Sequence, residues 1–416
     1  MSDSFIANPF LQSTRYGGRS VHLGISGSIA CYKAAELLRL LLALEIEVTA
    51  TLTEAAQRFI SPLLIKSLGA SKVYGDMFGE ACFSHLEPGR ESGAFIVAPA
   101  SADVLAKLAC GFGEDLLSTQ FLAFDGPVVL APAMNPRMWS HWAPQSNVKR
   151  LADAGCVIVP PETGKTACGE EGHGRLAAVQ AILLSCLRAL SPRDLANQRV
   201  MVTLGPTREP WDGVRYWSNP SSGRMGAALA TAAWLRGADV IAITGPGVDI
   251  FLPSAITRIE AGTASEMLEA ASRCWPGCSM GIFCAAVADF APVRPAGREK
   301  SKIAKHANPD GMKIEFLPNA DILKTLAAHR KPGQKIMGFA AEITEDDSAL
   351  FPAAMAKLVK KGADMIAANR VNCGTGAFGA PATSMAVVDK SGKQEIWPDM
   401  TKADIAWDLL SWLLKL

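Results

Sequence analysis

The chain has 416 residues, of which 49% are hydrophobic, and its formal net charge is +1. This length suits two or three domains with full cores, and the balanced charge gives no general attraction to nucleic acid or an anionic membrane. No apolar run approaches the roughly 20 residues of a membrane-spanning helix, and residues 1–19 lack the apolar core of a signal peptide. We therefore expect a cytoplasmic protein whose residues 1–19 form a flexible extension.

The first half of the chain alternates predicted strands and helices. Strands are predicted at 21–25 and 47–51 and in "AFIVAPA", "PVVLAPA" and "CVIVP", and helices at 29–44 and 176–190. Such alternation is typical of a parallel sheet covered on both faces. Residues 20–190 are therefore predicted to form a doubly wound flavodoxin-like or Rossmann-like α/β domain.

The segment "SPRDLANQ", residues 191–198, interrupts this pattern with proline, serine and charged residues, and is predicted to be a linker. A new strand follows in "RVMVTLG", then a helix at 227–236, a strand at 239–244, and a last helix at about 402–414. Three further strands run into loops in "GIFCAAVADF", "KIMGFAAE" and "ADMIAANR". Residues 199–416 are therefore predicted to form a second, Rossmann-like domain, with ligands expected at the carboxyl ends of the strands.

Ten cysteines occur, and most have apolar neighbours, so nine are predicted to be structural, reduced thiols. The exception is Cys168 in "TACGEEGHGR", where His173 follows five residues later. A metal site would need further ligands at compatible spacing, and none is apparent there. Cys168 is therefore a candidate for chemistry, and no metal ligands are assigned.

Polar residues follow several strands of the first half. In "GISGSIACYK", Gly27 permits a tight turn, and Ser28 can cap a helix whose free N–H groups suit a phosphate. An ordinary strand–turn–helix join needs the same residues, so this motif alone is weak, and its glycine pattern fits a mononucleotide better than a dinucleotide. Ser101, Ser118 and Asn135 occupy similar loops.

The first half resembles the flavin-dependent cysteine decarboxylases, in particular the phosphopantothenoylcysteine decarboxylases of coenzyme A synthesis. The resemblance lies in "GSIACYK", "SHLE", "APASAD", "PAMNPRMW" and "ACGEEGHGR", in this order. It implies oxidation of the substrate thiol by FMN, loss of CO₂ and a final reduction, with His85 as catalytic histidine, Asn135 binding the substrate carboxylate and Cys168 donating a proton. The FMN-binding residues that it implies are Gly27, Ser28, Thr53, Ser101 and Ser118.

The second half opens with the motif "VTLGPTREPWDGVRYWSNPSSGRMG" between a strand and a helix. Arg208, Arg215 and Arg224 could bind phosphate there, and "SSG" offers a helix N-terminus to an anion. A solvated loop is the alternative, but three arginines beside a glycine-rich turn favour a phosphate site. Lys357 and Lys361, four residues apart on one helix face, would add to it.

Residues 196–416 resemble the phosphopantothenate–cysteine ligases through "GPTREP", "VRYWSN", "SSGRMG", "AAVADF" and "GFAAE". The resemblance implies an acyl–nucleotide intermediate, on which Asn219 and Arg215 act, and fusion to a decarboxylase implies CTP rather than ATP. Lys302 matches the catalytic lysine, with Lys300 as the alternative, and Mg²⁺ is expected with the triphosphate. The implied CTP-binding residues are Ala285, Asp289, Lys302, Asn319, Ala320, Asp321, Ile322, Phe339, Lys357 and Lys361.

The two resemblances together predict a bifunctional enzyme that makes 4′-phosphopantetheine from 4′-phosphopantothenate, cysteine and CTP. The family further implies a homo-oligomer built from trimers, up to a dodecamer. One alternative is a decarboxylase of peptides that end in cysteine, against which the ligase-like half argues. Another is a non-catalytic FMN-binding regulatory subunit, against which the presence of His85, Asn135 and Cys168 argues.

Overall fold

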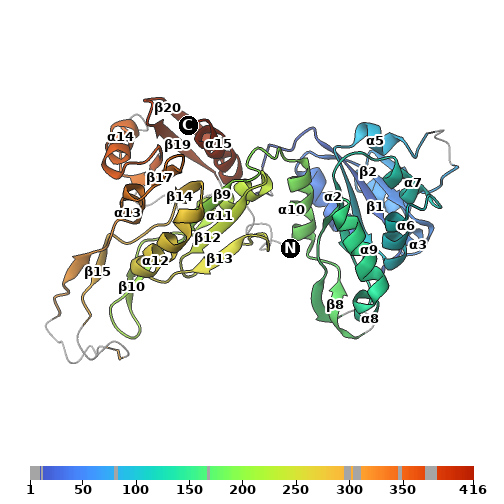
Figure 1. The fold of residues 1–416 in the computed structure, drawn as a ribbon, viewed down its shortest axis with the longest axis horizontal. Coiled ribbons are helices and arrows are strands. Elements are labelled where there is room, and N and C mark those ends of the chain that lie inside the picture. Colours follow the sequence, from blue (N-terminus) through green and yellow to red (C-terminus); the bar gives the residue numbers. More distant parts are fainter. Residues whose placement is uncertain are drawn as a thin grey trace. The chain divides into compact units, whose positions relative to one another are not determined.

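The computed structural model describes residues 10, 13–78, 83–165, 169–294, 301–302, 311–344, 349–370 and 382–416. They form two compact units (Figure 1). One runs from Thr14 to Pro192, and the other from Arg193 to Leu416 together with residues near the amino terminus. The change of unit lies inside the segment 191–198 that is predicted to be a linker. Among the described helices, none is both long enough and apolar enough to cross a membrane.

The residues that precede the first strand are packed where the structure describes them. Phe10 is fully buried, and Tyr16 is 2% exposed. The Tyr16 hydroxyl shares a hydrogen bond of 2.8 Å with the hydroxyl of Ser191, and the Ser13 hydroxyl donates to Asp404 at 3.0 Å. The prediction of a flexible extension over residues 1–19 is therefore wrong for these residues, because their apolar and hydroxyl groups find partners in the folded units.

The first unit contains a six-stranded parallel sheet in the order β3-β2-β1-β4-β5-β6. The direction of strand addition reverses between β1 and β4, which is the Rossmann order and not the flavodoxin order. All seven residues of β4 are buried, as expected for a central strand with both faces covered. The strands are β1 (Ser20–Ile25), β2 (Glu47–Leu52), β3 (Lys72–Tyr74), β4 (Ala94–Ala100), β5 (Val128–Pro132) and β6 (Val157–Ile158).

Helices cover both faces of this sheet (Figure 1). On one face α2 (Tyr32–Ala43) packs against α10 (Val179–Leu190). On the other, side chains of α6 (Ala102–Cys110), α7 (Leu116–Leu122) and α9 (Trp142–Asp153) share a core with β4 and β5. The remaining elements are short: η2 (Ile29–Cys31), α3 (Glu54–Gln57), α4 (Pro62–Ser67), α5 (Glu87–Glu91), α8 (Pro136–Ser140) and the hairpin β7 (Glu162–Lys165) and β8 (Glu171–Arg175).

The second unit contains an eight-stranded sheet in the order β13-β12-β9-β14-β17-β18-β19-β20. Its first six strands are parallel and repeat the Rossmann order, with the reversal between β9 and β14. The strands are β9 (Arg199–Leu204), β12 (Asp239–Thr244), β13 (Thr257–Glu260), β14 (Met280–Phe283), β17 (Lys335–Glu342), β18 (Met365–Arg370), β19 (Ala382–Asp389) and β20 (Gln394–Thr401). The predicted two-domain α/β fold is therefore confirmed.

The antiparallel strands β19 and β20 at the edge of this sheet were not predicted. They form a hairpin around "KSGK", where Gly392 has a φ of +88°, a value that favours glycine. A serine–glycine turn between two strand-like runs was the local signal for it.

Helices also cover both faces of the second sheet. On one face α11 (Arg224–Leu235) packs against α15 (Lys402–Lys415) and lies so close to β9 that a Cβ on Gly226 would be 2.4 Å from the Cβ of Leu204. On the other face α12 (Ala264–Cys274), α13 (Ile322–Ala328) and α14 (Leu350–Lys361) share a core with the strands. The remaining elements are η3 (Trp275–Gly277) and two ribbons, β10 (Arg208–Pro210) with β11 (Tyr216–Ser218) and β15 (Phe290–Pro292) with β16 (Phe316–Pro318).

Candidate active sites

Ser26 joins the ends of β1 and β4, where the strand order of the first sheet reverses. Its fully buried hydroxyl donates to the carbonyl oxygen of Pro99 at 2.7 Å and accepts from the N–H group of Ser101 at 2.8 Å. Open α/β sheets bind their ligands at such a reversal. Ser26 was not selected from the sequence, although it stands between the first strand and the predicted phosphate turn.

Three of the predicted cofactor-binding hydroxyls lie in loops that follow the neighbouring strands β1, β2 and β4. Ser28, Thr53 and Ser101 each cap a helix by accepting one backbone N–H group, at 3.3, 3.2 and 3.3 Å. A hydroxyl that accepts in this way still has its own hydrogen to donate. These loops therefore form a donor-rich edge, which suits a ligand that carries a phosphate.

Gly27 lies where two of these loops meet. A Cβ atom at this position would be 2.5 Å from the Cβ of Ala55, so no side chain fits. Glycine is therefore required here by the close approach of α3, which follows β2, to the loop after β1.

Ser118 differs from the other predicted cofactor-binding residues, because its hydroxyl is used inside its own helix. The side chain is 1% exposed and donates to the carbonyl oxygen of Asp115 at 3.0 Å, while Asp115 accepts from the Ser118 N–H group at 2.8 Å. Burial opposes ionisation of Asp115, but this N–H group and the ammonium of Lys107 hold its pKa below the usual value. The Ser118 hydroxyl therefore already both donates to and accepts from the backbone of Asp115.

Asn135 follows β5 and contacts the hairpin of β7 and β8. Its side-chain oxygen accepts from the N–H group of Arg137 at 2.8 Å, and its amide nitrogen donates to Glu170 at 2.8 Å. Glu170 also forms an ion pair of 3.2 Å with Arg137. Gly174 brings the hairpin this close, since a Cβ there would lie 2.4 Å from the carbonyl oxygen of Met134.

Cys168 lies outside the described residues, in the connection between β7 and β8. The described residue Glu170, two positions further on, lies beside Asn135. His173 contacts the hydroxyl of its cross-strand neighbour Thr163, with a shortest distance of 3.1 Å. Within the described ranges, no group of three His, Cys, Asp or Glu side chains could hold a metal ion.

His85 is half-buried in the loop before α5. The preceding carbonyl, that of Ser84, accepts a hydrogen bond of 2.9 Å from the side-chain amide of Gln120. The same amide accepts at 2.7 Å from the hydroxyl of Thr51, near the carboxyl end of β2. Two hydrogen bonds thus connect the loop of His85 to the sheet edge that carries Thr53.

A cavity of about 540 Å³ lies at the carboxyl ends of the central strands of the second sheet. It adjoins the reversal between β9 and β14, where the amide of Asn219 donates to the carbonyl oxygen of Val287 at 3.0 Å. At its other side Asp321 caps α13 and pairs with Lys361 at 3.5 Å. The predicted residues that line this cavity are Asn219, Ala285, Asp289, Asn319, Ala320, Asp321, Ile322, Phe339 and Lys361.

Three residues predicted for the same site do not line the cavity. Arg215 pairs with the buried carboxylate of Asp212 at 2.6 Å, and Lys357 pairs with Glu342 at 2.5 Å. Lys302 is exposed. Local carboxylates thus hold Arg215 and Lys357, whereas Lys300, the alternative to Lys302, lies outside the described residues.

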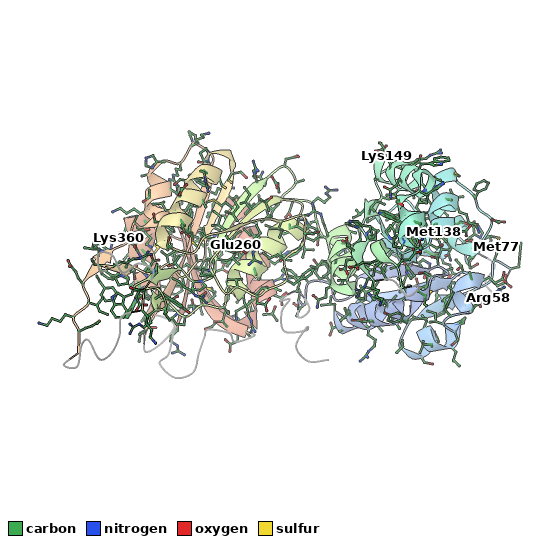
Figure 2. All side chains as sticks on the ribbon, turned by 90° about the horizontal axis from the view of Figure 1, so that it is seen from below. Arg58, Met77, Met138, Lys149, Glu260 and Lys360 are labelled. Atoms are coloured by element: carbon green, nitrogen blue, oxygen red, sulfur yellow. The ribbon has the colours of Figure 1, made fainter. Side chains whose placement is uncertain are left out.

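Lys302 and Arg215 nevertheless belong to neighbouring segments. The N–H group of Gly213 donates to the carbonyl oxygen of Ser301 at 3.2 Å, which joins the loop of Arg215 to the residue before Lys302. Lys360, labelled in Figure 2, is exposed on α14, next to the cavity-lining Lys361.

Two further cations line this cavity. Arg224 begins α11, and Lys402 begins α15. Lys402 is only 7% exposed, and burial, together with the charge of Arg224, lowers its pKa. Two cations and a helix N-terminus beside one cavity suit an anionic ligand. Arg224 was a candidate for phosphate binding, whereas Lys402 could be recognised only once α15 was placed against α11.

Two family models match the chain, one for each unit. Residues 10–191 match the model described as Flavoprotein. Residues 195–416 match the model described as DNA/pantothenate metabolism flavoprotein C-terminal domain.

Curated proteins are similar to the chain over nearly its whole length. The coenzyme A biosynthesis bifunctional protein CoaBC of Vibrio cholerae is 38% identical over 382 residues, which cover 91% of this chain and 94% of that protein. The protein of the same name from Escherichia coli is 39% identical over 366 residues, which cover 87% and 88%.

Solved structures match one unit at a time. The C-terminal domain of a coenzyme A biosynthesis bifunctional protein CoaBC is 32% identical, covering 54% of this chain and 97% of its own, with a TM-score of 0.43. The FMN-dependent cysteine decarboxylase SpaF is 28% identical, covering 42% and 99%, with a TM-score of 0.38.

Proposed function

Because the chain belongs to the family of bifunctional coenzyme A biosynthesis proteins, we propose that its two units catalyse two consecutive reactions. The unit of residues 199–416 joins 4′-phosphopantothenate to cysteine, and the unit of residues 20–190 decarboxylates the product to 4′-phosphopantetheine. The observation that carries this proposal is that each unit has its own candidate ligand site at the reversal of a Rossmann-order sheet. A peptide decarboxylase or a regulatory subunit would not account for the family match over residues 195–416.

FMN fits the donor-rich edge of the first unit. The hydroxyl groups of Ser28, Thr53 and Ser101 would hold it together with the backbone beside Gly27. A bound FMN supplies the reversible oxidation of the cysteinyl thiol that allows the neighbouring carboxylate to leave as CO₂.

Three residues of this unit act on the substrate in the proposed reaction. Asn135 donates its amide hydrogens to the substrate carboxylate, a role supported by the carboxylate of Glu170 that it already binds at 2.8 Å. His85 exchanges a proton with the substrate, as histidines often do near neutral pH. The Cys168 thiol, two residues before Glu170 in the sequence, donates the last proton, for which a group with a pKa of about 8.5 is suitable.

The ligase reaction takes place in the cavity of the second unit. CTP lies against Ala285, Asp289, Phe339, Lys361 and the segment 319–322, and Asn219 binds the acyl–cytidylate. Arg224 and Lys402 neutralise phosphate groups at the wall formed by the beginnings of α11 and α15.

Arg215, Lys302 and Lys357 take part after a local rearrangement. The contact of Gly213 with Ser301 supports a joint movement of Arg215 and Lys302 towards the transferring phosphate. Lys357 reaches the nucleotide once its pair with Glu342 opens. Mg²⁺ accompanies the triphosphate, and the carboxylate of Asp289 is the candidate ligand of the cavity wall.

The proposal includes a cytoplasmic homo-oligomer built from trimers. Large apolar side chains on the first unit support association, since Tyr32, Leu63 and Phe78 are 65%, 74% and 90% exposed. Light scattering of the purified protein tests it, and a monomeric mass would contradict it.

The proposed reactions are tested with the full-length protein, 4′-phosphopantothenate, cysteine and either CTP or ATP. We expect a yellow protein that forms 4′-phosphopantetheine faster with CTP than with ATP, as measured by mass spectrometry. Accumulation of phosphopantothenoylcysteine by the flavin-loaded protein would contradict the assignment of the first unit. Failure to form that amide would contradict the assignment of the second.

A further inference from the structure

Below the loop of His85, the core of the first unit contains a closed cluster of polar side chains. His22 and Gln120 are fully buried, and Thr51 and Thr49 are 1% and 7% exposed. The imidazole of His22 lies 2.8 Å from the hydroxyl of Thr49, 3.0 Å from that of Thr51 and 3.2 Å from the side-chain oxygen of Gln120. A polar cluster at this depth is costly unless each group is paired.

The hydrogen bonds of the cluster determine how Gln120 is oriented. The carbonyl of Ser84 can only accept, so it must face the NH₂ group of Gln120, at 2.9 Å. The oxygen of the same amide then faces Thr51, whose hydroxyl donates to it at 2.7 Å. Since Thr51 has used its hydrogen, Nε2 of His22 must be the donor, and Nδ1 accepts from Thr49.

His22 keeps this arrangement because it stays neutral. Burial lowers its pKa to about 3, well below the working range of most enzymes. A neutral imidazole has one donor and one acceptor, which is what the hydroxyl groups of Thr51 and Thr49 require. The cluster therefore has a single pattern of hydrogen bonds near neutral pH.

Among the described residues, this cluster reaches the loop that bears His85 through the hydrogen bond from Gln120 to the carbonyl group just before that histidine. On the other side of His85, the carboxylate of Glu87 accepts from the hydroxyl of Tyr74 and pairs with Lys72 at 3.1 Å. The Lys72 pair is half exposed and contributes little stability. The buried bond from Gln120 is therefore the attachment on the amino-terminal side of His85 and does not depend on an exposed ion pair.

We propose that Gln120 is a positioning residue of the decarboxylase reaction, which holds the main chain at Ser84 and thereby sets the place of the His85 imidazole. This inference rests on the proposed catalytic role of His85. Gln120 does not itself touch the substrate. It acts through the loop, while His22 and Thr51 hold the oxygen of its amide.

The first test replaces Gln120 with methionine, which has a similar shape but cannot donate to Ser84. We expect kcat for decarboxylation of phosphopantothenoylcysteine to fall about 10- to 100-fold, the scale known for small misplacements of catalytic groups, with KM little changed. The flavin absorption and the ligase activity of the same chain report that both units are folded. Thr49→Val, which removes a hydroxyl from the cluster but leaves the bond to Ser84, is the matched control and should retain most of kcat.

A double-mutant cycle separates positioning from general loosening of the core. If Gln120 acts through His85, Gln120→Met should cause no further loss of kcat in a His85→Asn background. Amide exchange at Leu86 and Glu87, whose N–H groups donate to the carbonyl oxygen of Phe83, should be faster in Gln120→Met. An unchanged kcat in flavin-loaded Gln120→Met, or a full additional loss in the His85→Asn background, would overturn the proposal.

Two further results keep the inference separate from the proposed function. If His85→Asn alone leaves decarboxylation intact, the role of His85 is wrong and the inference fails with it. If His85→Asn is inactive while Gln120→Met is fully active, only the positioning role fails. Should Gln120→Met not fold, Thr51→Val removes the bond that orients Gln120, and the same cycle is run with that variant.

Discussion

The side-chain amide of Asn135 donates a hydrogen bond of 2.8 Å to the carboxylate of Glu170, which Arg137 also holds at 3.2 Å. Asn135 is the residue proposed to bind the carboxylate of the substrate. The Asn135 amide group that would donate to the substrate carboxylate therefore already donates to Glu170 of the same chain. This contact connects the hairpin of β7 and β8 to the loop after β5.

We expect Glu170→Ala to lower KM for decarboxylation about 2- to 5-fold, because one competing carboxylate is removed and exposed ion pairs contribute up to about 1 kcal/mol. Steady-state kinetics with phosphopantothenoylcysteine measure the change. Glu171→Ala is the control, since Glu171 is the next residue after Glu170 and its side chain is exposed. A rise in KM would mean that Glu170 helps to bind the substrate.

Cys168→Ser should stop the first unit after the loss of CO₂, because a serine hydroxyl is too weak an acid to replace the thiol. We expect an enethiol product, two hydrogens lighter than 4′-phosphopantetheine by mass spectrometry, together with reduced flavin in the absorption spectrum. Cys110→Ser, at an exposed free cysteine, is the control. Normal output of 4′-phosphopantetheine from the Cys168 variant would refute the role of this thiol.

Lys402→Met should weaken the ligase and stabilise the fold at the same time. Loss of a charged contact to phosphate is expected to raise KM for an anionic substrate about 10- to 100-fold. Because burial lowers the pKa of Lys402, the folded state binds this proton less well than the unfolded state. The stability gained by the variant should therefore be present at pH 7 and disappear as the pH rises through the ordinary lysine range near 10.5.

Ligase kinetics and denaturant unfolding at several pH values measure these two effects of Lys402→Met. Lys360→Met, at an exposed position beside Lys361 on α14, should change neither. A variant of Lys402 with unchanged KM for both CTP and 4′-phosphopantothenate would remove this lysine from the proposed site.

His22 should make the first unit sensitive to acid. Its pKa is lowered to about 3, so between the ordinary value of 6.5 and about 3 the unfolded state binds one proton more than the folded state. Stability is then lost as the pH falls through this window, by about 1.4 kcal/mol for each pH unit.

Urea unfolding of the holoenzyme, followed by flavin fluorescence at pH 7 and at pH 4.5, measures the dependence on His22. His22→Gln should reduce the slope of the unfolding free energy against pH by nearly the amount that one proton contributes. His141→Gln, at an exposed histidine, should preserve this slope. An unchanged slope in His22→Gln would show that other groups cause the acid sensitivity.

Much of the fold could be predicted because its signals are local. The buried run "AFIVAPA" is β4, and the apolar pattern after Ala178 is α10, although this helix begins at Val179 and not at 176. The strand order, the hairpin of β19 and β20, and the packing of Phe10 were not predicted. Each depends on which segments meet after the chain has folded back on itself.

The family resemblance implied site roles for Asn135, Cys168 and the residues from Asn319 to Ile322, because its motifs occur at these loops. Packing decided which of the candidates meet. Asp212 holds Arg215 away from the cavity, α15 brings Lys402 to Arg224, and Gln120 reaches Ser84. The physical reason is that periodicity and turn chemistry act over a few residues, whereas a hydrogen bond or a desolvated charge depends on every segment that packs around it.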